Sequence, residues 1–348
     1  MTQTVYRQKT LLIFLVSSLL LIPSQITPGS LFLVSDAYEK ITVVAVVEQL
    51  GSVIREIGGE RVDVVTVIPP NVEPHHYEPS ADMLVNTLSK ASLIVVTSSY
   101  HFPAEDKIYQ LVKEGLIKAK VIGLPDYQRK GLKLLSNPKT GDINIHGFHF
   151  SISGLRAIAS TIAGELIGLD PANEQYYKQR LNNYLIRLDE IEKTIKVIVK
   201  KSVRVIIYTP ILQYVINDLE LELAGIVVNE VDVEPSEKDI SEMINKLQRK
   251  EAEYILFSDN EVSENPKLLD ILNSQGLPYL IIPLSRFTAT PELVSLSTAI
   301  LLSSHEPSYV QEKVASSNNM LFVLSIITNV ILIILVILLF VKVRGYGK

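Results

Sequence analysis

The sequence predicts an α/β protein with two (βα)4-like lobes of parallel sheet, bridged by one long rigid α-helix and followed by a C-terminal transmembrane helix. Three observations predict this fold. Between Lys40 and Ser303, short β-branched runs alternate with amphipathic stretches, as in parallel sheets covered by helices on both faces. One uninterrupted amphipathic stretch separates the two halves, and the last apolar run is long enough to cross a bilayer.

The expected strands form two sets of four, which suggests two similar lobes. In the first half they are Ile41–Val47, Val62–Ile68, Leu93–Thr97 and Lys120–Gly123, with helices at Glu48–Ile57 and Ala104–Leu116. In the second half they are Val203–Tyr208, Ala224–Asn229, Tyr254–Phe257 and Tyr279–Pro283. The intervening helices are expected at Pro210–Asp218, Ser236–Arg249, Pro266–Gln275 and Pro291–Leu302.

A single long helix is expected to join the halves. Asp170 and Pro171 form a typical helix start, and apolar residues then recur every three or four positions with no glycine or proline before Lys201. About 30 residues at 1.5 Å each give a rod of about 45 Å. Such a helix would hold the lobes at a nearly fixed distance, unlike a flexible hinge.

The C-terminal apolar run, Met320–Val341, has the length and composition of a transmembrane helix. Three basic residues follow it, namely Lys342, Arg344 and Lys348, so the positive-inside rule predicts a cytoplasmic C-terminus. The main part of the protein is therefore expected outside the cell membrane, with the chain crossing it once.

The N-terminus resembles a secretory signal. Basic residues precede the apolar run Leu11–Ile22, and Ser35-Asp36-Ala37 offers a cleavage site. Because Leu31–Val34 lengthens the apolar region, an uncleaved anchor is the alternative. The expected organisation is a signal peptide or anchor (1–37), a metal-binding lobe (38–152), a helical connection (153–202), a second lobe (203–303), a stalk (304–319), a transmembrane helix (320–341) and a cytoplasmic tail (342–348).

Composition narrows the possible functions. The 348 residues include no cysteine, which excludes disulfides, thiolate metal sites and a lipid-modified cysteine within this sequence. The formal net charge is -5, and the basic residues of the two terminal segments mask a central portion nearer about -10. That charge disfavours nucleic acid and anionic lipid as partners. A transition metal would have to be bound by imidazole and carboxylate.

Histidines gather where the expected strands of the first half end. Five of the six histidines lie in these connections, namely His75, His76, His101, His146 and His149. Ligands of open α/β sheets bind beyond the carboxyl ends of the strands, and imidazole is the commonest transition-metal ligand. The pattern therefore predicts a metal site, although His76 and His149 could be ordinary loop residues and His305 lies in the stalk.

Two motifs carry a family resemblance. Ile57-Gly58-Gly59-Glu60-Arg61-Val62, followed by Ile68-Pro69-Pro70-Asn71-Val72-Glu73-Pro74-His75-His76-Tyr77-Glu78-Pro79, resembles the signature of the zinc- and manganese-type substrate-binding proteins of ABC transporters. His146-Gly147-Phe148-His149-Phe150-Ser151 resembles the second histidine motif of that family. The resemblance covers residues 40 to 303, including the bridging helix. It implies that His75 and His146 are metal ligands.

The second lobe departs from the family pattern. The histidine or glutamate that the resemblance places after its first strand falls at Tyr208 or Thr209, and neither is a strong ligand. The expected carboxylate could be Asp259, with Glu261 and Glu264 as rivals. His101, which follows the third strand, could supply a third nitrogen, and His149 stands where the family usually has tryptophan.

The resemblance implies a membrane-tethered, extracytoplasmic receptor. It would act as a monomer, capture Zn²⁺ or Mn²⁺ between the lobes and deliver the ion to an ABC permease. One alternative is a receptor of the same architecture for a metal chelate such as a siderophore or haem, although the chain has no tryptophan to line such a cleft. The other is an exported metal-dependent hydrolase, but the sequence has no His-Glu-x-x-His helix and no Gly-x-Ser-x-Gly elbow. A role other than catalysis is therefore expected.

Overall fold

The computed structural model describes residues 39–70, 72–99, 101–199, 203–231 and 233–304. Contacts divide the chain into a unit of residues 1–39 and a unit of residues 40–348, and the elements below belong to the second unit. The predicted signal segment, the stalk and the predicted transmembrane helix at 320–341 lie outside the described residues.

The first lobe is built on a parallel sheet of four strands in the order β2-β1-β3-β4. The strands are β1 (Ile41–Ala45), β2 (Val62–Thr66), β3 (Leu93–Val95) and β4 (Lys120–Ile122). In the register, Val43 of the central strand faces Val64 on one side and Leu93 on the other. Val43, Val44 and Ala45 are fully buried, as expected of a strand covered on both faces.

Helices cover this sheet, and one of them is capped by a neighbouring side chain. They are α2 (Glu48–Gly58), α3 (Ala81–Leu88), α4 (Pro103–Lys113) and α5 (Leu124–Arg129), with short 3-10 turns η2 (Gly59–Arg61), η3 (Pro74–His76) and η4 (Phe148–Phe150). Ser80 caps α3 by accepting a hydrogen bond from the backbone of Met83. A small antiparallel hairpin, β5 (Leu135–Ser136) with β6 (Ile143–Asn144), was not expected from the sequence.

The second lobe repeats the arrangement. Its strands are β7 (Arg204–Ile207), β8 (Glu222–Ile226), β9 (Tyr254–Ser258) and β10 (Tyr279–Ile282), all parallel, in the order β10-β9-β7-β8. In both sheets the second strand of the lobe lies beside the first, and the third and fourth follow on the other side. The other elements are η6 (Pro210–Leu212), α8 (Gln213–Asp218), α9 (Glu237–Gln248), α10 (Asp259–Glu264), α11 (Pro266–Ser274), η7 (Leu284–Phe287) and α12 (Leu293–Ser304). The predicted α/β fold with parallel sheets is confirmed.

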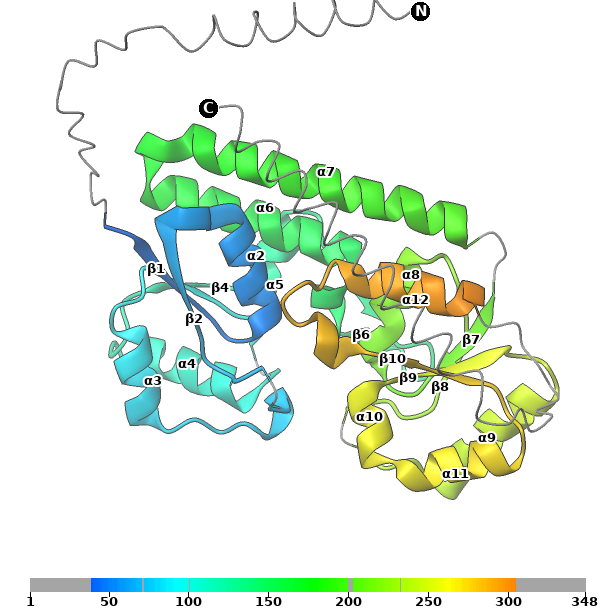
Figure 1. Ribbon diagram of the computed structural model, residues 1–348. Coiled ribbons are helices and arrows are strands. Elements are labelled where there is room, and N and C mark those ends of the chain that lie inside the picture. The colour runs from blue at the N-terminus through cyan, green and yellow to red at the C-terminus, as the bar shows by residue number, and fades with distance from the viewer. Residues whose placement is uncertain (1–38, 71, 100, 200–202, 232, 305–348) are drawn as a thin grey trace, which may run out of the picture. The chain divides into compact units, whose positions relative to one another are not determined.

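Two helices lie against both lobes. Figure 1 shows α6 (Ile152–Leu169) beside α7 (Glu174–Ile198), with α7 extending past the first lobe toward the second. The 25 residues of α7 span about 37 Å. The helix is shorter than expected because Pro171–Asn173 form a 3-10 turn, η5, ahead of it. It packs on α2 of the first lobe and on α12 of the second.

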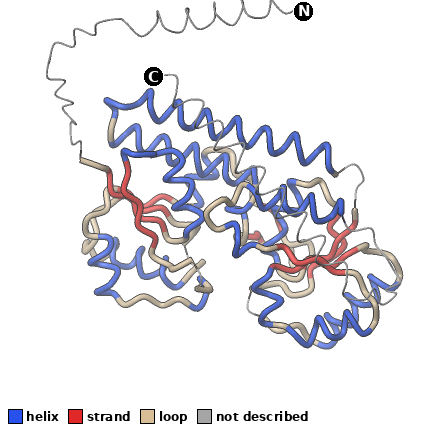
Figure 2. The backbone as a smooth tube through the Cα atoms, in the orientation of Figure 1, coloured by secondary structure: helices blue, strands red, loops and turns tan. Residues whose placement is uncertain are grey.

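The helices lie outside the two sheets, which Figure 2 draws in red. Among the described residues, α6 alone has the length and hydropathy of a membrane span, and 56% of it is buried within the protein. It packs against α2, α5 and α7, so its apolar composition is explained by its place in the core. The main hydrophobic core runs from Val43 in the first sheet to Leu256 in the second and thereby connects the lobes.

Candidate metal centre

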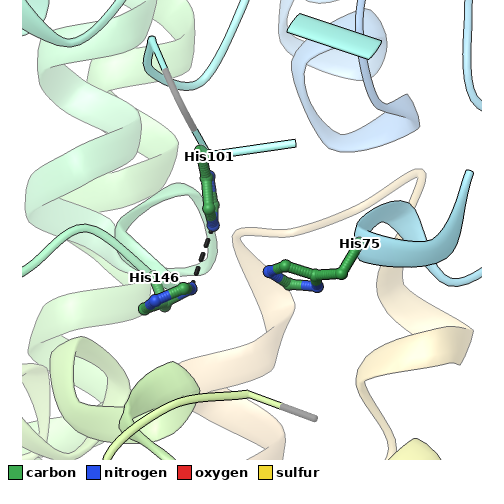
Figure 3. A group of neighbouring side chains, drawn as sticks. All are labelled: His75, His101 and His146. Carbon is green, nitrogen blue, oxygen red and sulfur yellow. Dashed lines mark hydrogen bonds between the residues drawn. The ribbon is translucent and has the colours of Figure 1, made fainter. Parts of the chain in front are cut away.

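Three histidines meet at one edge of the first lobe. His75 lies in η3 after β2, His101 lies between β3 and α4, and His146 follows the small strand β6. One ring nitrogen of each lies within 4.8 Å of the others, and the three side chains converge in Figure 3. His75 and His101 follow the carboxyl ends of parallel strands, as expected. His146 arrives by a different route, from the hairpin.

The ring of His75 is held by its neighbour Glu73. Glu73 precedes Pro74 in the first turn of η3, and its Oε1 lies 2.7 Å from Nδ1 of His75. Burial raises the pKa of Glu73, but the hydrogen bond and the charge of His75 outweigh it, so the pKa is lowered. An ionised carboxylate can only accept, so His75 donates from Nδ1 and presents Nε2 for coordination.

His101 is a buried, neutral imidazole. Burial, and then the charges of the neighbouring histidines, lower its pKa well below the usual range. Its Nδ1 lies 2.7 Å from the hydroxyl of Thr97, two residues after the end of β3. A metal ligand must be the neutral form of histidine, and this environment supplies it.

His146 connects the cluster to the second lobe. Its Nδ1 lies 3.0 Å from Nε2 of His101, and its Nε2 lies 3.3 Å from Oε2 of Glu230. Glu230 lies between β8 and α9 in the second lobe. Asn144 accepts a hydrogen bond from the backbone N–H of His146, and Gly147 turns the chain with a φ of +77°. A residue with a side chain at this position could not make the turn without strain.

The cluster opens into a cleft between the lobes of about 430 Å³. Both lobes line it. The first contributes the three histidines, and the second contributes Thr209, Glu261 and Leu284 among others.

The expected second-lobe ligands are placed differently. The carboxylate of Asp259 accepts hydrogen bonds from the backbone N–H and the hydroxyl of Ser285, and Asp259 is not part of the three-histidine group. The hydroxyl of Tyr208 donates to Asn265. The structure therefore brings His75, His146 and His101 together, but it does not bring Asp259 to them.

Glu261 and Thr209 bind each other at the wall of the cleft. The Thr209 hydroxyl donates to the carboxylate of Glu261, which also accepts from the backbone of Ser258 and so caps α10. Burial raises the pKa of Glu261 to about 7. Glu264 also lines the cleft, while His149 is buried and burial lowers its pKa to about 3. His76 is exposed.

Comparison with known proteins identifies the family. Residues 43–281 match the family model described as the periplasmic zinc-uptake complex component A, ZnuA. The chain belongs to this family. The resemblance expected from the motifs around His75 and His146 is confirmed.

Individual relatives are distant. The manganese ABC transporter substrate-binding lipoprotein PsaA of Streptococcus anginosus is 27% identical over 173 residues, which cover 45% of this chain and 51% of that protein. The high-affinity zinc uptake system protein ZnuA of Bacillus subtilis is 22% identical over 245 residues, 68% of this chain and 76% of that protein. The match to the streptococcal relatives thus spans about half of their length.

Solved structures share the fold. The substrate-binding protein FpvC of P. aeruginosa in complex with Ni²⁺ has a TM-score of 0.64 at 21% identity, covering 79% of this chain and 100% of that chain. A structure described as the periplasmic zinc-binding protein TroA of Treponema pallidum has a TM-score of 0.61 at 16% identity, covering 76% and 99%. The family fold therefore extends over both lobes.

Sequence reasoning missed the side chains behind the histidines, which are Glu73, Thr97, Glu105 and Glu230. Glu73 could have been found, because it lies two residues before His75 in a turn stiffened by proline. Glu230 could not, because its distance to His146 depends on how the second lobe folds against the first.

Proposed function

We propose that the protein is an extracytoplasmic receptor that binds a divalent transition metal, Zn²⁺ or Mn²⁺, between its lobes and delivers it to an ABC permease. One observation carries the proposal. Each of the three clustered imidazoles has a second nitrogen near an oxygen, namely that of Glu73 for His75, Thr97 for His101 and Glu230 for His146. Metal-bound histidines in proteins nearly always have such an outer partner.

The proposed ligand atoms are Nε2 of His75, Nε2 of His101 and Nδ1 of His146. The ring nitrogens on the far sides then donate to their oxygen partners. Asp259 is not included, because its carboxylate is hydrogen-bonded to Ser285. A fourth position is left for water or for a carboxylate of the second lobe that lines the cleft, Glu261 or Glu264.

The ligand set favours zinc. Imidazole nitrogens suit Zn²⁺, whereas Mn²⁺ prefers oxygen donors, and affinity rises from Mn²⁺ to Zn²⁺ in the general order of divalent metals. The names of the relatives include both manganese and zinc proteins, and FpvC was solved with Ni²⁺. We therefore propose that this site binds Zn²⁺ more tightly than Mn²⁺.

The long helix α7 constrains how the site opens and closes. It packs on α2 and α12, one from each lobe, and so favours small tilts of the lobes over wide closure. In this scheme the second lobe contacts the site through Glu230, the outer partner of His146, and through the cleft wall, and the permease separates the lobes to release the ion.

The apolar segment 320–341 is proposed as the membrane anchor, with the lobes outside and the C-terminus in the cytoplasm. Its length and the basic residues after it support this orientation. The full chain should stay with the membrane after alkaline extraction, and a variant ending at Ser304 should not. Retention of the shorter variant would contradict the anchor.

Metal titration tests the binding proposal directly. Isothermal titration of the full chain in detergent micelles should show binding of Zn²⁺, which the double variant His75→Ala/His146→Ala should lose. His76→Ala is the matched control, because His76 lies in the same turn but is exposed. If the wild type binds no divalent metal at micromolar concentration, the proposal fails.

A metal chelate is the second candidate ligand. The cleft of about 430 Å³ is far larger than a bare ion needs and falls within the range of pockets for small organic ligands, about 300–1,000 Å³. A chelate receptor would bind a ferric siderophore or haem with a change in absorption, and would bind free Zn²⁺ weakly. We propose no catalytic role.

A further inference from the structure

A buried carboxyl group lies near the three-histidine cluster but belongs to none of the three histidines. Glu105 is in the first turn of α4, four residues after His101, and its side chain is fully buried. An acidic residue is almost never fully buried unless a partner binds it. The partner is Thr97, which is also fully buried.

Thr97 lies between Glu105 and His101. Its Oγ1 is 2.8 Å from Oε1 and 3.1 Å from Oε2 of Glu105, and on the other side it is 2.7 Å from Nδ1 of His101. The backbone N–H of Thr97 donates to the same carboxylate. Glu105, Thr97 and His101 thus form one chain of hydrogen bonds that ends at the three-histidine cluster.

The direction of this chain follows from the number of hydrogens. The hydroxyl of Thr97 has one hydrogen, and an ionised Glu105 can only accept it. The oxygen of Thr97 must then accept from Nδ1–H of His101. That places the proton of the neutral imidazole on Nδ1 and leaves the lone pair on Nε2, which without metal accepts from Nδ1–H of His146.

We propose that Glu105, in its ionised form, and Thr97 are positioning residues that fix the tautomer of His101, so that its Nε2 is available to the metal. The inference rests on the proposed function, in which His101 is a ligand. Without the hydroxyl, the buried Nδ1–H would lose its acceptor. The imidazole would then move its proton to Nε2 and donate to Nδ1 of His146 across the 3.0 Å that separates them.

Groups around the Glu105 carboxyl change its pKa, and this pKa decides the pH at which the proposal is tested. Burial raises the pKa of Glu105 to about 8, while the backbone N–H groups of Thr97, Ser98 and Phe102 lower it in part. Tyr109, Tyr127 and Asp126 are the other titratable groups that interact with this region. The tautomer should therefore be measured at a pH above the pKa of Glu105, where the carboxylate is ionised.

The first experiment determines the tautomer of His101 in the metal-free protein. The full chain, labelled with ¹⁵N in histidine and held in detergent micelles with a chelator, should show His101 as the Nδ1–H form, assigned by comparison with His101→Ala. In Thr97→Val the signal should change to the Nε2–H form, and Thr97→Ser should restore Nδ1–H. Finding the Nε2–H form in the wild type overturns the proposal, and that result does not depend on whether the variants fold.

The second experiment reads affinity for Zn²⁺ by competition with a chromophoric chelator. Thr97→Val should weaken binding by roughly 10–100-fold, the usual effect of removing an outer partner of a metal ligand, and Thr97→Ser should return it to the wild-type range. In a His101→Ala background, Thr97→Val should cause no further loss. An equal loss in both backgrounds would show a general effect on folding and would overturn the positioning role.

The two experiments separate the inference from the function beneath it. A wild type with the expected tautomer but no affinity for Zn²⁺ would contradict the proposed function alone. A wild type that binds Zn²⁺ and keeps its affinity in Thr97→Val would contradict the positioning role alone.

Discussion

The Nε2 atom of His101 lies 3.0 Å from Nδ1 of His146, although 45 residues separate the two histidines in the sequence. Two imidazoles bound to one zinc ion at about 2.0–2.1 Å in tetrahedral geometry have their nitrogens about 3.4 Å apart. A shift of a few tenths of an ångström would thus allow both nitrogens to hold the same ion. This relationship makes His101 a ligand in our proposal, where the family pattern has none.

The first prediction compares the contributions of His101 and Asp259 to Zn²⁺ affinity. His101→Ala should lower the affinity for Zn²⁺ by at least about tenfold, because one of three nitrogen donors is lost. Asp259→Asn should leave it nearly unchanged, since the Asp259 carboxylate is bound to Ser285. Competition titrations of both variants decide the matter. The reverse outcome would mean that the carboxylate expected from the family resemblance is the true ligand.

The sequence predicted the scaffold better than the site. Alternating β-branched runs gave the strands to within a few residues, because strands buried on both faces leave a strong signal. The hairpin before His146 was missed, since each of its strands has only two residues. Its strands are held by contacts from the second lobe, where Tyr214 donates to the backbone of Asn144. The local pattern of apolar and polar residues does not indicate such contacts between lobes.

The same limit applies to the metal centre. Histidines next to strand ends were visible in the sequence, so His75, His101 and His146 could be chosen. Asp259 was chosen for its position after the third strand of the second lobe. Its side chain instead bonds to Ser285, which follows the neighbouring strand β10, and this depends on loop geometry. Periodicity says which residues end a strand but not where their side chains point.

The second prediction concerns the carboxylates behind His75 and His146. Glu73→Gln should weaken Zn²⁺ binding by roughly 10–100-fold, because an amide cannot hold Nδ1–H of His75 as an ionised carboxylate does. Glu230→Gln should have a smaller effect, since the Glu230 side chain is 66% exposed, against 23% for Glu73, and water can replace it. Titration of the two variants in the same buffer gives the comparison. Equal losses would contradict the argument from exposure.

The third prediction is a fall in stability with rising pH in the metal-free protein. Burial raises the pKa of Glu105 from 4.5 to about 8, so its contribution to stability is complete below about 4.5 and is lost as pH rises toward about 8. Glu261, whose pKa is raised to about 7, acts in the same direction. Buried His101 and His149 have lowered pKa values and act in the opposite direction at acid pH.

The range between neutral pH and pH 8 therefore isolates the carboxyl groups. Denaturant unfolding with a chelator present should give a lower free energy of unfolding near pH 8 than near pH 7. Glu105→Gln, which cannot ionise, should show a shallower decline, whatever its absolute stability. A wild type that grows more stable over this range would contradict the burial of an ionisable Glu105.

The fourth prediction tests how α7 connects the lobes. Arg187 of α7 forms ion pairs with Glu56 of α2 at 3.0 Å and with Glu292, just before α12, at 3.4 Å. Glu292 is a buried residue, so Arg187→Met should leave its carboxylate without this partner and cost about 1–3 kcal/mol of unfolding free energy. Lys178→Met on the same helix removes an exposed pair with Glu174 and should cost little. Equal effects in denaturant unfolding would show that Arg187 does not join the lobes.

The last prediction concerns Gly147, the residue after His146. Its φ of +77° disfavours any side chain, and a Cβ there would lie 1.9 Å from the backbone oxygen of Ile211 in the second lobe. Gly147→Ala should therefore push the lobes apart or shift His146, and lower both the unfolding temperature and the affinity for Zn²⁺. Gly141 is the matched control, with a φ of +82° and no atom within 4 Å of its added Cβ. Gly141→Ala carries the backbone strain without the collision, so it should cost some stability and leave metal binding intact. If the two variants bind Zn²⁺ alike, the close approach of Gly147 to Ile211 does not position His146.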